Sequence, residues 1–160
     1  MKSFLSFLES YGIFIWLGLM VSFVLILYFT GRRQIREFGN VDYSKARFYE
    51  KFASGYSTKS WKTKRGGASR TLHILITDDE FILKTFMFVA YVAKRHDLLH
   101  RIPLKNVISA EVRRKLFQTE LLVTCTTEEG EMKKFVLISA AQNRIKELLD
   151  EAISKNPNMS

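Results

Sequence analysis

Cysteine and proline are scarce in this chain of 160 residues, which has one cysteine, Cys125, and two prolines. A single cysteine cannot form a disulfide within the chain, so the class of small disulfide-stapled secreted domains is excluded and a reducing compartment is indicated. The sequence also lacks a glycine motif of the nucleotide-binding kind, and its carboxylates show no pair spaced for acid–base catalysis. We therefore expect a protein that is not an enzyme and binds no cofactor.

The most informative absence is that of charge, because no Asp, Glu, Lys or Arg occurs from Ser10 to Gly31. As a helix that rises about 1.5 Å per residue, residues 11–30 would cross the ~30 Å hydrocarbon core of a bilayer. The residues expected to anchor this helix at the two interfaces are aromatic or basic: Tyr11, Trp16, Tyr28, Arg32 and Arg33. The sequence thus predicts an N-terminal tail and one transmembrane helix in residues 1–31.

Other interpretations of the apolar run fit less well. A cleaved signal peptide would have a shorter apolar core and a small-x-small cleavage site, whereas this run ends in Thr30-Gly31-Arg32-Arg33. A buried core helix is a poorer match still, because a domain of this size could not surround a helix that is apolar on every face. Gly18 and Ser22 form a small-xxx-small pair, which leaves a homo-oligomer open.

Basic charge is concentrated directly after the apolar run. Residues 32–70 contain eleven Lys and Arg against three Asp and Glu, whereas residues 71–160 contain thirteen against twelve. The positive-inside rule then places the C-terminal portion in the cytoplasm and the N-terminus outside. For a chain held at a membrane, anionic lipid is a nearer partner than nucleic acid. We expect a single-pass protein of the inner (cytoplasmic) membrane, with the bilayer as a partner and no nucleic-acid partner.

Residues 32–55 are predicted to form a basic juxtamembrane linker. Asp42 is a candidate N-cap, and apolar residues recur at helical spacing in residues 43–52, so a short amphipathic helix is expected there. Such a helix would either lie on the membrane or pack on the following domain.

Residues 56–155 have the pattern of a β-rich domain closed by a helix, and residues 156–160 are predicted to be a tail. Residues 60–64 are expected to form the first strand with Trp61 facing inward, and about six further short strands follow up to Ile138. Ser139 and Gln142 are expected to form a capping box for a final helix. The apolar stripe of that helix must be buried against the sheet.

Residues 75–83 read LITDDEFIL, and residues 102–112 read IPLKNVISAEV. These segments resemble the LTDxxLxL hairpin and the IPLxxIxxVxV strand pair of the pleckstrin-homology superfold, in its bacterial PH-like and GRAM-like forms. The resemblance covers residues 60–153. It implies a membrane-anchored α+β protein with a PH-like antiparallel β-barrel or sandwich of about seven strands, capped by a C-terminal α-helix. It also implies docking on phospholipid or on a partner protein, without catalysis.

The segment between the first two expected strands is the candidate binding site. Lipid-binding members of the family that the chain resembles carry basic residues in the matching loop. Two glycines would let backbone amides approach an anion, and flanking cations would hold a phosphate. The alternative is non-specific contact with an anionic leaflet. The candidate contact residues are Lys62, Lys64, Arg65, Gly66, Gly67 and Arg70.

Two other segments deserve an interpretation. Residues 86–93 are almost wholly apolar and form either a core segment or a membrane- or partner-binding element. The run His96-Asp97-Leu98-Leu99-His100 superficially resembles the zinc motif H-E-x-x-H, but Asp97 is shorter than the required Glu and Pro103 cuts off a long helix. No metal site is therefore expected.

Two functional hypotheses follow from these features. The first is a single-pass, membrane-anchored PH-like docking or scaffold module on the cytoplasmic face, which binds a partner protein, anionic phospholipid headgroups, or both. The second is a small accessory subunit of a larger inner-membrane complex, in which the helix and residues 86–93 bind partner chains.

Overall fold

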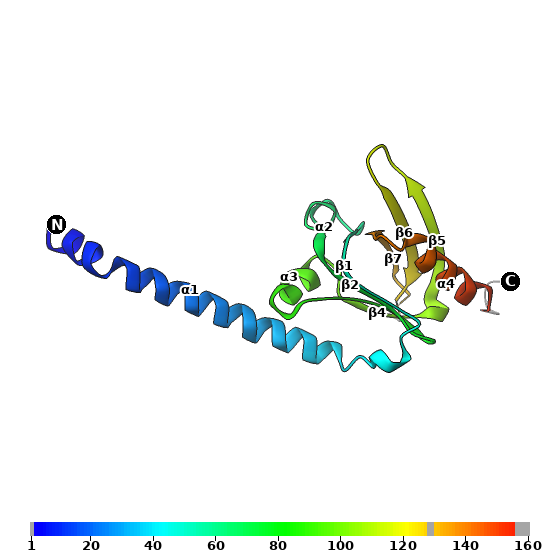
Figure 1. The fold of residues 1–160 in the computed structure, drawn as a ribbon, viewed down its shortest axis with the longest axis horizontal. Helices are drawn as coiled ribbons and strands as arrows, with labels where there is room; N and C mark the ends of the chain where they lie inside the picture. The colour runs from blue at the N-terminus through cyan, green and yellow to red at the C-terminus, as the bar shows by residue number, and fades with distance from the viewer. Residues whose placement is uncertain (1, 128–129, 156–160) are drawn as a thin grey trace.

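The computed structural model describes residues 2–127 and 130–155, so the predicted tail at residues 156–160 lies outside the described residues. A long helix, α1 (Lys2–Phe38), extends to one side of a β-rich domain (Figure 1). Its segment Tyr11–Arg36 is long and apolar enough to cross a membrane, by length and composition, and the apolar window within it is 0% buried by the protein. The predicted helix over residues 11–30 is confirmed, whereas its insertion into a membrane stays a prediction.

Seven antiparallel strands form one sheet in the order β4-β3-β2-β1-β7-β6-β5. The edge strands are β4 and β5, and the described residues show no pairing between them, so the sheet is open rather than a closed barrel. The strand number and the final helix confirm the predicted α+β architecture. The strands are β1 (Phe48–Ser57), β2 (Ala68–Ile76), β3 (Glu80–Thr85), β4 (His100–Pro103), β5 (Val107–Arg114), β6 (Thr119–Thr126) and β7 (Met132–Ile138).

Strand β1 occupies the second half of the region predicted to be an amphipathic helix at residues 43–52, and that prediction is wrong. Asp42 does cap a turn, because its carboxylate accepts a hydrogen bond from the Ser44 N–H at 3.0 Å, but the turn is a single 3-10 turn, η1 (Tyr43–Lys45). The sheet then begins at Phe48 rather than near Tyr56. A bulge around Phe52, whose φ is 64°, interrupts the alternation of β1, which explains why its apolar residues fall at helix-like spacing.

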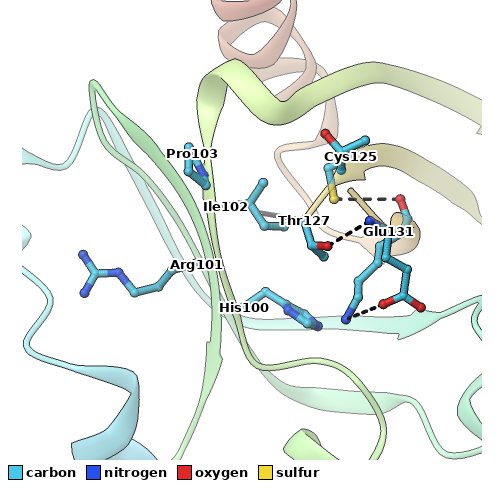
Figure 2. A pocket seen from close by; sticks show the side chains of 9 residues that line it. His100, Arg101, Ile102, Pro103, Cys125, Thr127 and Glu131 are labelled. Carbon is cyan, nitrogen blue, oxygen red and sulfur yellow. Dashed lines mark hydrogen bonds and ion pairs between the residues drawn. The ribbon is translucent and has the colours of Figure 1, made fainter. Parts of the chain in front are cut away.

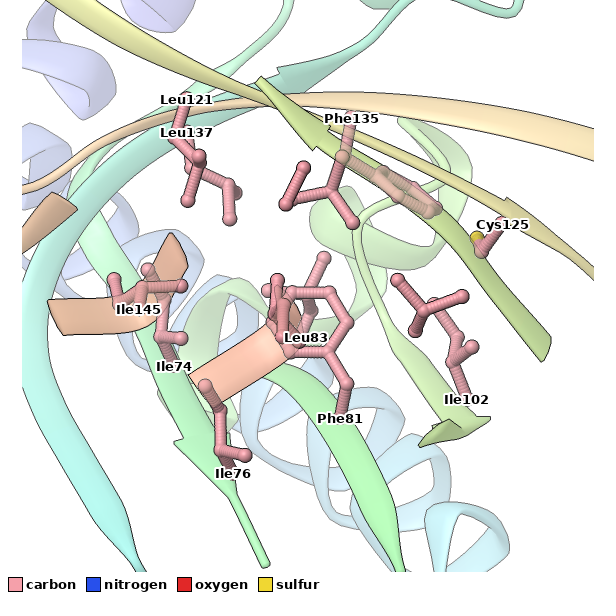
Figure 3. Packing of buried hydrophobic residues seen from close by; sticks show 14 of the residues in the cluster. Ile74, Ile76, Phe81, Leu83, Ile102, Leu121, Cys125, Phe135, Leu137 and Ile145 are labelled. Carbon is pink, nitrogen blue, oxygen red and sulfur yellow. The ribbon is translucent and has the colours of Figure 1, made fainter. Parts of the chain in front are cut away.

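The core lies between the two halves of the sheet and helix α4 (Gln142–Ser154). Phe81 and Leu83 of β3 face Phe135 and Leu137 of β7 across this core (Figure 3). Ile145, Leu148 and Leu149 of α4 are at most 2% exposed, and burying a side chain of this size contributes about 1.5–3 kcal/mol. The predicted apolar stripe of the final helix is therefore part of the core.

The start of α4 differs from the predicted capping box. Its N-cap is Ala141, which makes no side-chain cap. The Ser139 hydroxyl instead accepts from the Ala141 N–H at 2.9 Å and donates to the Glu50 carboxylate. The Gln142 side-chain amide donates to the Thr119 carbonyl. These bonds join the start of α4 to β1 and β6.

Two contacts fix the position of α1 on the domain. After α1, Val41 packs on Leu75 and Ile82, on the face of the sheet opposite the main core. Further along the chain, the short elements η2 (Met87–Val89) and α3 (Ala90–Arg95) pack against α1 itself. Gly31 is buried at this contact, and η2 approaches it so closely that a Cβ at this position would overlap the Met87 carbonyl. A 3-10 turn, η3 (Leu104–Asn106), then joins β4 to β5.

Candidate docking site

The predicted binding segment begins with a short helix, α2 (Trp61–Arg65), so the strand predicted at residues 60–64 is wrong. Ser60 and Thr63 start this helix reciprocally. The Ser60 N–H donates to Thr63 Oγ1 at 2.9 Å, and the Thr63 N–H donates to Ser60 Oγ at 3.2 Å. Trp61 is consequently 64% exposed instead of facing inward.

The predicted cations of this segment separate into two places. Lys64 and Arg65 are exposed on α2, and the Arg65 guanidinium lies 4.2 Å from the centre of the Trp61 ring, a cation–π contact. Arg70 belongs to β2, where its N–H donates to Ser54 Oγ at 2.9 Å. The side chain of Lys62 lies outside what the structure describes. The structure therefore places Lys64 and Arg65 on α2 and Arg70 on β2.

The two predicted glycines serve the packing of α2. A Cβ on Gly66 would overlap the ring of His96, and a Cβ on Gly67 would lie 2.7 Å from the Gly55 carbonyl oxygen. Both positions thus allow close approach of α2 to neighbouring segments, which is a different role from the predicted contact with an anion.

Residues 86–93 form η2 and the start of α3, and their side chains point two ways. Ala90 and Ala93 are buried against the domain, whereas Phe88, Tyr91 and Val92 are 49%, 47% and 46% exposed. The inner side of this segment belongs to the core, and its outer side is an apolar surface. The core interpretation therefore holds for the inner side, and binding of a membrane or a partner by the outer side stays a prediction.

The structure brings the two predicted segments side by side. A groove of about 650 Å³ lies between α2 and α3. The sequence has no acidic residue in residues 51–77 or 81–96, so these two segments add only positive charge. Apolar surface with guanidinium groups beside it suits an amphiphilic anion. The residues that give the groove this character are Trp61, Arg65, Tyr91, Val92 and Arg95.

Helices α2 and α3, which border the groove, lie on the side of the domain from which α1 extends, whereas α4 lies on the opposite side (Figure 1). The ring centres of Tyr28 in α1 and Phe88 in η2 are 6.3 Å apart. Arg32 and Arg33 are exposed one turn further along α1. Of the predicted membrane anchors, Tyr28 thus lies against η2, and Arg32 and Arg33 follow it on α1, whereas Tyr11 and Trp16 lie in the N-terminal half of α1.

The histidine-containing segment forms a polar cluster around Asp97, which has a φ of 58°. The Asp97 carboxylate accepts hydrogen bonds from Ser57 Oγ at 3.0 Å, from His100 Nε2 at 3.0 Å and from Lys133 Nζ at 2.8 Å. Burial alone would raise the pKa of Asp97, but the hydrogen bonds from His100 and Lys133 outweigh it and hold the pKa well below its usual range. The cluster joins the end of α3 to β1, β4 and β7.

A pocket of about 350 Å³ lies beside this cluster, between β4 and the ends of β6 and β7 (Figure 2). Burial raises the pKa of the Cys125 thiol in its wall to about 11, so the thiol is protonated at neutral pH. Arg101 points away from the thiol and pairs with Glu80 at 2.6 Å. Residues 2–127 and 130–155 contain no group of three His, Cys, Asp or Glu side chains placed to hold a metal. The charged side chains in the pocket wall are thus already paired, Arg101 with Glu80, and His100 and Lys133 with Asp97.

Sequence reasoning missed the tip of the β5–β6 hairpin. The Lys115 N–H donates to the Gln118 carbonyl at 2.9 Å, which places Leu116 and Phe117 at the centre of a tight turn. They are 96% and 98% exposed. Gly, Asn and Asp are the usual residues of such turns. The sequence could have indicated this surface, because a Leu-Phe pair is unusual in the turn between two predicted strands.

No protein-family model matches the chain, and no curated protein matches it. Among solved structures, it is similar to the DH/PH domain of human ARHGEF11 in a ternary complex with human RhoA and its inhibitor, with a TM-score of 0.45 and 18% identity over 69% of this chain and 29% of that chain. It is also similar to the PDZ-RhoGEF DH/PH domains in complex with RhoA activated by GTP-gamma-S, with a TM-score of 0.47 and 17% identity over 78% of this chain and 33% of that chain. The chain thus spans a third or less of the length of each. Both similarities are weak and assign no function.

Proposed function

We propose that this chain is a single-pass membrane protein in which α1 holds a docking module at the cytoplasmic face of the inner membrane. The observation that carries the proposal is the exposure of α1: none of its apolar window is buried, and Trp16 and Phe23 are 70% and 59% exposed. Exposing this surface to water would cost about 25 cal/mol of free energy for each Å² of apolar area, and insertion into a bilayer would remove that cost. Arg32, Arg33 and the basic residues that follow favour the cytoplasmic side.

The domain at the end of α1 is proposed to bind and not to catalyse. Arg65 and Arg95 beside the apolar lining of the α2–α3 groove support contact with anionic phospholipid headgroups. Neither Cys125, in the wall of the pocket beside the Asp97 cluster, nor Ser57 of that cluster is an activated nucleophile. Burial raises the pKa of Cys125 to about 11, and Ser57 donates to the Asp97 carboxylate instead of an imidazole. The domain surfaces turned away from the bilayer stay open to a protein partner.

Cysteine labelling tests the anchor and its orientation. Cys125→Ala removes the one native cysteine, and Ser3→Cys or Arg114→Cys then adds a single thiol at the N-terminus or in the domain. On intact cells, a membrane-impermeant maleimide should label Ser3→Cys alone, and Arg114→Cys should become reactive only after lysis. Recovery of the protein in the soluble fraction, or labelling of Arg114→Cys on intact cells, would refute the proposal.

A second function, as an accessory subunit of a membrane complex, is favoured by the apolar tip of the β5–β6 hairpin. Leu116 and Phe117 are almost fully exposed at this tip and suit an apolar pocket in a partner protein. Purification of the full chain from native membranes in a mild detergent tests this function. A stoichiometric complex that is lost in the Leu116→Ser, Phe117→Ser variant supports it, and a monomer under every mild condition contradicts it.

A further inference from the structure

The level at which the apolar run of α1 ends coincides with the level at which the domain contacts α1. Gly31 is the last residue before Arg32, and it packs directly on the Met87 backbone of η2. Tyr28, one turn earlier, lies against Phe88, with ring centres 6.3 Å apart. If α1 spans a bilayer, η2 must therefore lie where hydrocarbon gives way to headgroups.

The outward side chains of η2, of α3 and of α2 across the groove are apolar or aromatic. Phe88, Tyr91 and Val92 are close to half exposed on η2 and α3, and Trp61 is 64% exposed across the groove on α2. Trp and Tyr rings are enriched at the headgroup level of membranes, because they combine an apolar body with a polar atom. These four side chains have the composition of an interfacial surface.

The charge of the same elements matches an anionic leaflet. Lys64 and Arg65 follow Trp61 on α2, and Lys94 and Arg95 follow Val92 on α3. Residues 51–77, which include α2, contain no acidic residue. Residues 81–96, which include η2 and α3, contain none either. Cations next to interfacial rings hold a surface element on anionic lipid through electrostatic attraction.

We propose that α2, η2 and α3 form a membrane seat: Trp61, Phe88, Tyr91 and Val92 enter the headgroup layer of the leaflet that α1 leaves, and the adjacent Lys and Arg contact its anionic lipids. The seat fixes the orientation of the domain, with α4 turned away from the bilayer. This inference rests on the proposed function, because it requires α1 to span the membrane.

The two tryptophans of the chain test the seat and the span separately. Trp16→Phe leaves Trp61 as the sole tryptophan, and Trp61→Phe leaves Trp16. The full-length variants are reconstituted into vesicles of phosphatidylcholine and phosphatidylglycerol that carry bromine at a shallow or a deep position of the acyl chain. Trp61 should be quenched at least about twofold more by the shallow label than by the deep label. Trp16, near the outer end of the apolar run, should be quenched by both labels if α1 spans the bilayer.

The outcomes separate the two proposals. If Trp16 is quenched and Trp61 is not quenched by either label, the seat is wrong and the membrane span stands. If neither is quenched, the proposed function fails together with the seat. Shallow quenching of Trp61 that is equal with and without phosphatidylglycerol would remove the electrostatic part of the seat.

Matched variants show which side chains form the seat. Phe88→Ser with Tyr91→Ser should abolish most of the quenching of Trp61, whereas Leu116→Ser with Phe117→Ser, an exposed apolar pair elsewhere, should leave it unchanged. Arg65→Gln with Arg95→Gln should lessen its dependence on phosphatidylglycerol. Circular dichroism and the thermal midpoint confirm that each variant is folded. Equal loss of quenching in both serine pairs would overturn the assignment.

Discussion

Helices α1 and α4 both carry apolar side chains, but the protein buries only those of α4. In α4, Ile145, Leu148 and Leu149 share one face, which the sheet covers, and the opposite face carries pairs such as Arg144–Glu147 at 3.1 Å. In α1, the apolar side chains point in every direction and the domain covers only its last turns. The difference is one of periodicity: a stripe can be covered by a single sheet, whereas a helix apolar on all sides needs a surrounding medium.

The largest expected effect would break this comparison from the side of α4. Leu149→Ala should lower the free energy of unfolding of the domain by about 2–5 kcal/mol, because it removes fully buried methyl groups and leaves a cavity in the core. Urea unfolding of the full chain in detergent micelles, followed by near-UV circular dichroism, measures it. The matched control is Leu17→Ala in α1, which is 63% exposed and should leave the unfolding of the domain unchanged.

A smaller effect is expected at Asp97, where the end of α3 meets the core. Asp97→Asn keeps a residue that tolerates the positive φ but removes the charge bonded to His100 and Lys133. The free energy of unfolding should fall by about 2 kcal/mol, which is the typical loss for hydrogen bonds to a charged group. The exposed pair Arg144–Glu147 provides the control, because Glu147→Gln should have little effect.

The pH dependence gives the Asp97 prediction a sign. The pKa of Asp97 is lower in the folded protein than its ordinary value of 3.8, so its stabilisation is present above pH about 4 and is lost as the pH falls towards the folded value. The native protein should therefore lose more stability than Asp97→Asn between pH 5 and pH 2, a range chosen to bracket about two units around the ordinary pKa. Parallel curves for the two proteins would show that the carboxylate contributes nothing.

The success of sequence reasoning followed the same division between local and distant determinants. The stripe of α4 and the six strands from β2 to β7 were predicted, because alternation or helical spacing within each segment decides its structure. Strand β1 was missed, because its second half pairs with residues 135–138, far along the chain, and its bulge hides the alternation. Long-range pairing of this kind leaves no mark in the local pattern.

The candidate site shows the same limit. Residues 62–70 and 86–93 were each singled out by composition, but their adjacency across the α2–α3 groove depends on the pairing of β1, β2 and β3. The reciprocal cap of Ser60 and Thr63 was hidden in the sequence, because the usual signature has Glu or Gln at the position of Thr63. Only Ser60, a residue type common at N-caps, pointed to a helix start.

A change at the contact between α1 and the domain sharpens the comparison further. Gly31→Leu would place a side chain where the Met87 backbone lies, so η2 must move away from α1. Because the main core does not include this contact, the free energy of unfolding should change by only about 1 kcal/mol, while shallow quenching of Trp61 should fall. Gly18→Leu is the control, since a Cβ there meets nothing within 4 Å. Equal behaviour of the two variants would argue against a fixed orientation of α1.

The smallest effect on stability is expected at the hairpin tip, which is apolar and exposed like α1 but small. Leu116→Ser with Phe117→Ser removes no buried contact, because the two side chains are 96% and 98% exposed, so the free energy of unfolding should change by less than about 0.5 kcal/mol. Polar residues also suit the centre of a tight turn better, so a slight gain in stability is consistent with this reasoning. The thermal midpoint of the full chain measures the change, with Phe135→Ala in the core as the contrasting variant. A clear loss of stability in the tip variant would mean that Leu116 and Phe117 are covered within the folded protein, and the tip would then no longer be a candidate surface for a partner.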